Sequence, residues 1–178
     1  MFILYREVRQ TERSRKNSNE NEGMKHLVWM RNTIFLLLAI LALQFWLGMT
    51  INLEVNIPVK HLGPLSSILY FGGHFIFVLL HIANGFFILV VAIVLLSLSF
   101  MNRHSSLKIV SVITLASVMG AIVNGILFLD SGQFFGWSIG MAMSAVSALI
   151  SASIGLFLVG HLLGLEESKS SKIDPPGY

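Results

Sequence analysis

Residues 71–100 read FGGHFIFVLLHIANGFFILVVAIVLLSLSF, and this stretch decides the fold class. It contains no Lys, Arg, Asp or Glu, and it is longer than the roughly 20 apolar residues that a helix needs to cross a bilayer. It nevertheless contains His74, His81 and Asn84. Polar side chains inside a span are costly and usually face protein or a functional site. The stretch therefore predicts a membrane protein and indicates where its function resides.

The composition of the whole chain agrees with this interpretation. Of the 178 residues, 54% are hydrophobic and 12% are charged, whereas a soluble domain averages about 25% charged residues. The net charge of +3 does not indicate nucleic-acid binding, because the basic residues cluster near one end of the chain, and we expect no nucleic-acid partner. The absence of Cys excludes disulfides, thiolate metal ligands, iron–sulfur clusters and thiol nucleophiles.

Four apolar segments predict an all-α integral membrane protein, an antiparallel four-helix bundle within residues 33–165. The predicted spans are residues 33–52, 73–99, 109–129 and 135–165. The second apolar segment is too long for one crossing, so we place its break at the Gly72–Gly73 pair.

Polar segments flank the predicted bundle on both sides. Residues 1–32 predict a basic, largely disordered cytoplasmic tail, and residues 166–178 predict a polar cytoplasmic tail. The sequence from Met24 is also typical of a chain start, so we hold as a hypothesis that residues 1–23 are an upstream extension. Mass spectrometry of the native N-terminus tests that hypothesis.

The Lys and Arg residues predict the orientation of the bundle. All twelve except Lys60 lie in the two tails or in the 101–108 turn. Because cytoplasmic segments of membrane proteins are enriched in basic residues, both termini are predicted to be cytoplasmic, in a multi-pass protein of the plasma membrane. Trp29 at the inner boundary and Tyr70 and Trp137 at the outer boundary fit the aromatic belts of such proteins.

Polar side chains on three predicted helices fall at one depth. At 1.5 Å per residue, Gln44 and His81 each lie about 12 Å below the outer ends of their helices, and Asn124 lies about 9 Å below its own. Each belongs to a stripe of polar or small residues at helical spacing, and such a stripe usually faces protein. We therefore predict a polar pocket in the outer half of the membrane, open to the outside and walled by the first three helices.

The two histidines are the candidate cofactor and metal ligands. His81 is the candidate axial ligand of a haem b, and His74, about 10 Å away along the axis, is a second ligand or a gate. Gln44, Asn84 and Asn124 are the candidate polar support, which would fix the tautomer of the histidine. The alternative is that His81 only hydrogen-bonds to these side chains within the bundle.

Small residues recur at every fourth position of the last predicted span. One row comprises Gly136, Gly140, Ser144, Ala148 and Ala152, and a second comprises Ser147, Ser151 and Gly155. Such rows are typical of close helix packing. Packing within the bundle is the favoured interpretation, and a sliding helix or a docking face for another membrane-protein subunit are the alternatives.

Three segments together resemble a known pattern. They are LQFWLGMTINLEVNIP at 43–58, GHFIFVLLHIANGFFIL at 73–89 and GAIVNGILFLD at 120–130. Over about residues 35–160 the chain resembles a family of small four-helix prokaryotic membrane proteins without an assigned function. The regions of Gln44, Gly48 and His81 resemble, more weakly, one four-helix half of haem A synthase, where intramembrane histidines ligate haem. The chain departs from that enzyme in having no acidic residue inside a span.

These observations predict a haem-b-binding or redox-associated protein of the respiratory membrane, with no catalytic residue assigned. The alternative is a non-catalytic subunit or assembly factor of a larger membrane complex. A carrier of a small solute or a metal ion is a third hypothesis. It is less favoured because no intramembrane carboxylate is present as a proton relay and four spans are few for a transporter.

Overall fold

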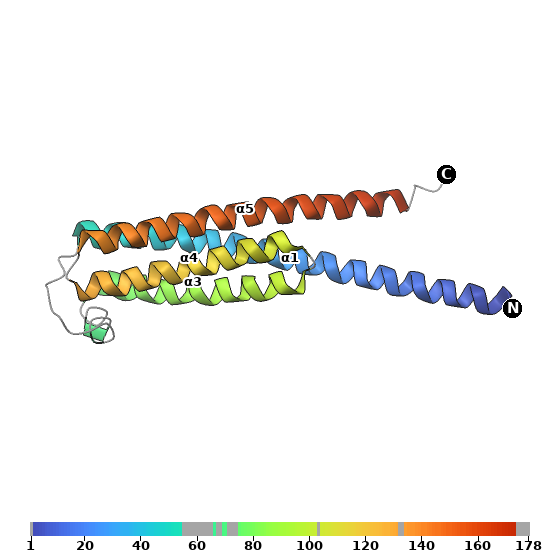
Figure 1. Cartoon of the computed structure of the whole chain (residues 1–178), viewed down its shortest axis with the longest axis horizontal. Helices are drawn as coiled ribbons and strands as arrows, with labels where there is room; N and C mark the ends of the chain where they lie inside the picture. Colours follow the sequence, from blue (N-terminus) through green and yellow to red (C-terminus); the bar gives the residue numbers. More distant parts are fainter. Residues whose placement is uncertain are drawn as a thin grey trace.

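The computed structural model of the chain describes residues 2–54, 66, 69–70, 75–102, 104–131 and 134–173. Their side chains are described at 22–53, 66, 69–70, 75–102, 104–131, 134–166 and 168. Its long helices are α1 (Phe2–Glu54), α3 (Ile76–Met101), α4 (Ser105–Asp130) and α5 (Phe135–Ile173) (Figure 1). Each of the four is long and apolar enough to cross a membrane. The all-helical prediction and the predicted number of spans are therefore confirmed.

The structure differs from the sequence prediction at the ends of the bundle. Residues 9–23, which the sequence predicted to be disordered, belong to α1, and α5 continues past residue 165 to Ile173. The tail before α1's span contains no Pro and is rich in Arg, Lys and Glu, which favour helix. Extending an existing helix is much easier than nucleating a new one, so the membrane span propagates into the tail. The predicted break at Gly72–Gly73 lies outside the described residues.

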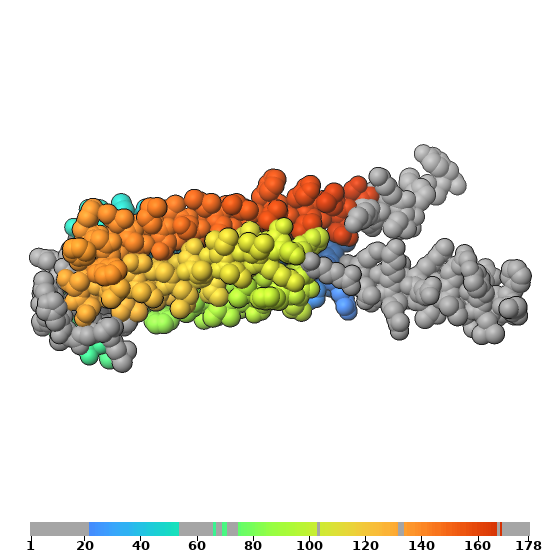
Figure 2. Space-filling view, in the orientation of Figure 1, coloured from blue at the N-terminus to red at the C-terminus, as the bar shows by residue number. Residues whose placement is uncertain are grey.

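The four helices pack in a ring. Each described helix contacts two others, in the cyclic order α1, α3, α4 and α5. Figure 2 shows α4 and α5 side by side along one face of the molecule. The Phe2 end of α1 and the Ile173 end of α5 project from the same end of the bundle (Figure 1), which we call the terminal end. The opposite end is the loop end.

Two clusters of buried apolar residues hold the helices together. The larger lies toward the terminal end, and its fully buried members include Met30, Leu37, Leu95, Leu107 and Val159. The smaller lies at the loop end and consists of Ile51, Val78, Phe128 and Leu129. Large apolar side chains also cover much of the outside of the bundle, as expected for helices that face lipid.

The small-residue rows of α5 pack inside this bundle. Ala148 and Ala152 are fully buried, and a Cβ on Gly155 would lie 3.2 Å from Val110 of α4 and 3.4 Å from Ile34 of α1. Small residues thus allow close approach of the helices. Gly136 and Ser147 are the exceptions, because both are exposed. Most residues of the two rows therefore pack against the protein's own helices, as the favoured interpretation predicted.

Candidate functional site

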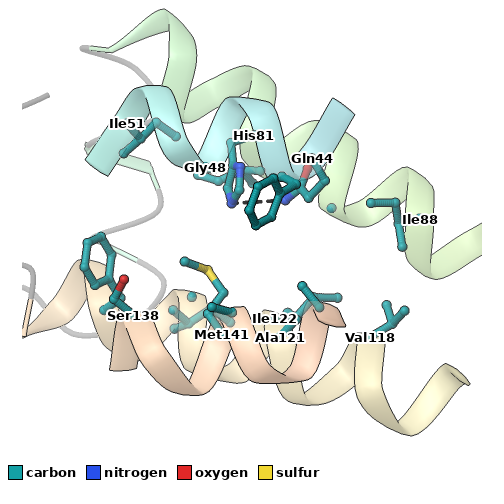
Figure 3. A pocket seen from close by; sticks show the side chains of 18 of the residues that line it. Gln44, Gly48, Ile51, His81, Ile88, Val118, Ala121, Ile122, Ser138 and Met141 are labelled. Carbon is teal, nitrogen blue, oxygen red and sulfur yellow. Dashed lines mark hydrogen bonds between the residues drawn. The ribbon is translucent and has the colours of Figure 1, made fainter. Parts of the chain in front are cut away.

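A chain of polar groups joins α1 to α3 near the middle of the bundle (Figure 3). Asn84 of α3 donates to the backbone carbonyl of Ile40 at 3.1 Å and to Gln44 Oε1 at 2.8 Å. Gln44 Nε2 lies 3.0 Å from Nε2 of His81. His81 and Asn84 are three residues apart and therefore share a helix face. The sequence prediction that these three side chains support one another is consistent with this geometry.

Two glycines let the helices approach closely enough for these bonds. A Cβ on Gly48 would lie 3.1 Å from Cε1 of the His81 ring, and a Cβ on Gly85 would lie 3.5 Å from Nε2 of Gln44. The imidazole therefore rests against the backbone of α1, in a space that any larger residue at position 48 would narrow. Each long polar side chain faces a glycine on the opposite helix.

The directions of the bonds assign the proton on His81. A carbonyl oxygen only accepts, so Ile40 fixes the amide of Asn84 with its nitrogen toward α1. The second N–H of that amide makes Gln44 Oε1 the acceptor and leaves Gln44 Nε2 to donate to His81 Nε2. A neutral imidazole that accepts at Nε2 has its proton on Nδ1. That nitrogen is buried and has no hydrogen-bond partner.

A cavity of about 210 Å³ adjoins this polar chain. Figure 3 shows it between the α1–α3 pair, which contributes His81 and Gln44, and the α4–α5 pair, which contributes Met141 and Ser138. Its wall is otherwise almost entirely apolar and includes Ile122 of α4. All four helices line the cavity, whereas the sequence predicted a polar pocket walled by three.

The two ends of the cavity are filled by side chains. Toward the terminal end it stops at Leu41, Ile88, Val118 and Ala148, which belong to the larger core cluster. Toward the loop end it is bounded by the four residues of the smaller cluster. The predicted opening to the outside stays a prediction, because most of the segment between α1 and α3 lies outside the described residues.

The cavity reaches the outside of the bundle through its flanks. Phe45 and Met49 of α1 line it and are each 49% exposed, and Phe86 of α3 lines it and is 53% exposed. These side chains lie on the surface that faces lipid in a membrane. The cavity beside His81 is therefore bordered in part by residues of the outer surface of the bundle.

The structure separates Asn124 from the other predicted site residues. Its amide donates to the carbonyl of Gly120 in its own helix at 2.7 Å, and its side chain lies against Gly140 of α5. Asn124 does not line the cavity. Its direction around the α4 axis points it at α5 rather than into the cavity. His74 lies outside the described residues.

Sequence reasoning missed the backbone and apolar parts of the site. The carbonyl of Ile40 orients the chain of polar groups, and no sequence pattern marks a backbone acceptor. Gly48 carried a signal, because it follows Gln44 by one helical turn in the predicted polar stripe. Ser138 of α5 lines the far wall and lay on no recognised motif.

A haem does not fit this site as the structure describes it. A cavity of roughly 150 Å³ holds a benzene molecule, and 210 Å³ is far too small for a porphyrin. Nε2 of His81 is also engaged by the amide of Gln44. Among the described residues, no three His, Asp or Glu side chains gather to hold a metal ion.

Comparison of the chain with protein-family models, with curated proteins and with solved structures finds no match. The family resemblance drawn from the three sequence segments therefore stays a prediction. The functional argument rests on the geometry of the cavity alone.

Proposed function

We propose that this membrane protein holds a small lipophilic molecule within the bilayer, in the cavity beside His81. The observation that carries the proposal is the form of that cavity. It is apolar on nearly all sides, filled at both ends and bordered on its flanks by half-exposed side chains. Ligand sites typically combine an apolar lining with a few placed polar groups. Gln44 and His81 supply that polar element here.

The proposal includes an orientation in the membrane. With both termini in the cytoplasm, the helices run antiparallel, and the loop end faces the outside of the plasma membrane. The basic residues support this orientation, because all except Lys60 belong to segments at the terminal end. The cavity then lies in the outer half of the bilayer. A ligand reaches it by partitioning into lipid and entering between helices.

The haem and subunit hypotheses have less support. The cavity volume and the bond to Nε2 of His81 disfavour a haem. The burial of Ala148 and Ala152 leaves less of α5 for a partner subunit. An absorption spectrum of the purified protein checks the haem directly, since a Soret band that shifts on reduction would restore that hypothesis.

The experiment that tests the proposed function fills the cavity. Ala145 lines it, and Ala145→Phe would occupy much of its volume. Ala83 is an exposed alanine of α3 outside the cavity, so Ala83→Phe is the matched control. Each protein is purified in mild detergent, extracted with organic solvent and analysed by mass spectrometry, and then titrated with a fluorescent apolar probe.

We expect the unmodified protein and Ala83→Phe to retain a lipophilic molecule and to bind the probe. Ala145→Phe should lose both while keeping its helical circular-dichroism spectrum. Equal probe binding by all three proteins would contradict the proposal, because binding would then not depend on the cavity.

A further inference from the structure

We infer that the ligand presents a carbonyl oxygen to His81, as a quinone head group or a lipid ester does. This inference rests on the proposed function and names the chemistry of its ligand. The observation behind it is the buried Nδ1 of His81, which has no hydrogen-bond partner. A buried donor without an acceptor is rare in proteins and calls for a ligand or water that satisfies it.

The chain of hydrogen bonds leaves one imidazole atom of His81 without a partner. Asn84 uses both of its N–H groups, on Ile40 and on Gln44 Oε1. Gln44 then donates to Nε2 of His81, so this nitrogen is used as an acceptor. What remains on the imidazole is the N–H at Nδ1. A hydrogen-bond acceptor is the complement of this N–H, and a carbonyl oxygen is such a group.

The place of Nδ1 lets a ligand in the cavity reach it. The ring edge carrying this nitrogen rests against Gly48, and a Cβ there would lie 3.7 Å from Nδ1. Both residues line the cavity. Because the glycine has no side chain, the inference requires only that the imidazole turn from this backbone contact toward the cavity that it lines.

The size and openings of the cavity fit a ring-shaped head on an apolar tail. Its 210 Å³ exceeds the roughly 150 Å³ that holds benzene. A substituted six-membered ring therefore fits, and a longer tail does not. The tail leaves through a flank, beside Phe45 and Met49 or beside Phe86, into the surrounding lipid.

The test compares a quinone with its reduced form. The protein in phospholipid nanodiscs is titrated with decylubiquinone and with the corresponding quinol, and quenching of tryptophan fluorescence reports binding. The quinone carbonyl is a stronger acceptor than the phenolic oxygen of the quinol. We expect the quinone to bind about 10-fold more tightly, the effect of one hydrogen bond.

His81→Phe keeps the ring and removes the N–H, so it should weaken quinone binding about 10-fold and leave quinol binding nearly unchanged. His161→Phe is the matched control, because His161 is exposed on α5 and lies outside the cavity. The infrared carbonyl band of ¹³C-labelled quinone should shift to lower frequency in the unmodified protein. This measurement needs no variant to fold.

The outcomes separate this inference from the proposed function. Suppose that an apolar probe binds normally, that quinone and quinol bind with equal affinity, and that the infrared band does not shift. That result contradicts the hydrogen bond to a ligand carbonyl but leaves the proposed function of the cavity intact. Failure of every probe overturns both. In a third outcome, decylubiquinone fails to bind while an ester lipid co-purifies with the unmodified protein and is lost in His81→Phe. In that case the inferred ligand carbonyl is confirmed and belongs to a lipid ester.

Discussion

His81 owes its orientation to a backbone carbonyl on another helix. The carbonyl of Ile40 orients Asn84, Asn84 orients Gln44, and Gln44 holds Nε2 of the imidazole. Each bond in a membrane contributes only modestly to stability, on average about 0.6 kcal/mol. Their combined effect is to fix direction, since each group has a single assignment of donor and acceptor once the carbonyl is in place.

We predict that removing Asn84 changes the tautomer of His81. In the unmodified protein, ¹⁵N NMR of the imidazole should show a protonated Nδ1 and an unprotonated Nε2. Asn84→Leu releases Gln44, whose amide then turns freely, so the ring should become a mixture of tautomers. Asn124→Leu is the control, because Asn124 bonds only within its own helix and touches α5. Unchanged shifts in Asn84→Leu would show that the tautomer has another cause.

A second prediction concerns the contact of Gly48 with the imidazole. Gly48→Ala places a methyl group 3.1 Å from Cε1 of His81 and should displace the ring. Alanine also stabilises a helix relative to glycine, by up to about 1 kcal/mol. Gly160→Ala gains the same preference, with nothing within 4 Å of the new atom. We expect Gly48→Ala to be about 1–3 kcal/mol less stable than Gly160→Ala, measured by unfolding in detergent. Equal stability would mean that the ring moves aside without cost.

At the scale of elements, α4 and α5 form the closest pair. The hydroxyls of Thr114 and Ser151 are 2.8 Å apart and buried. A Cβ on Gly120 would lie 3.1 Å from Ser144 Oγ. Small residues and short hydroxyl side chains bring the two backbones together along most of their length. The α4–α5 pair thereby provides a firm wall opposite the polar chain of α1 and α3.

The α4–α5 contact predicts opposite results for two leucine substitutions on α5. Gly140 faces Asn124, so Gly140→Leu should push the helices apart and cost about 1–3 kcal/mol. Ser147 is exposed and bonds only to the carbonyl of Met143 in its own helix, so Ser147→Leu should be nearly neutral. Thermal unfolding in detergent compares the two. If Ser147→Leu proved as destabilising as Gly140→Leu, α5 would have to pack through both faces.

At the scale of the whole molecule, the bundle is filled at its two ends and hollow between them. The larger core cluster joins all four helices toward the terminal end, and the smaller cluster joins α1, α3 and α4 at the loop end. The cavity lies between the clusters. Apolar clusters on both sides of this cavity suit the proposed ligand, which dissolves in lipid.

The orientation of the whole bundle can be tested with reporter fusions. Fusions after Lys60 and after Ser131 should report an extracytoplasmic location, and a fusion after Arg103 should report a cytoplasmic one. The reason is the distribution of basic residues, of which Lys60 alone lies between the first two spans. Alkaline phosphatase and green fluorescent protein fusions give complementary signals. A cytoplasmic signal after Lys60 would reverse the bundle and move the cavity to the inner half of the bilayer.

Position along each helix can be predicted from the sequence, whereas direction around the helix cannot. The rise of a helix is constant, so counting residues predicts similar depths for Gln44, His81 and Asn124. Which neighbour a side chain faces depends on how four helices rotate as their side chains interdigitate. That rotation brought Gln44 to His81 and turned Asn124 toward Gly140.

The class of protein follows from local properties of the chain, because apolar composition and span length are sums over neighbouring residues. The cavity is a non-local property. It exists where side chains from four helices fail to fill the space between two clusters, and its openings lie where Phe45 and Phe86 reach the lipid-facing surface. Packing of residues distant in sequence sets such a space, so it became visible only in the folded bundle.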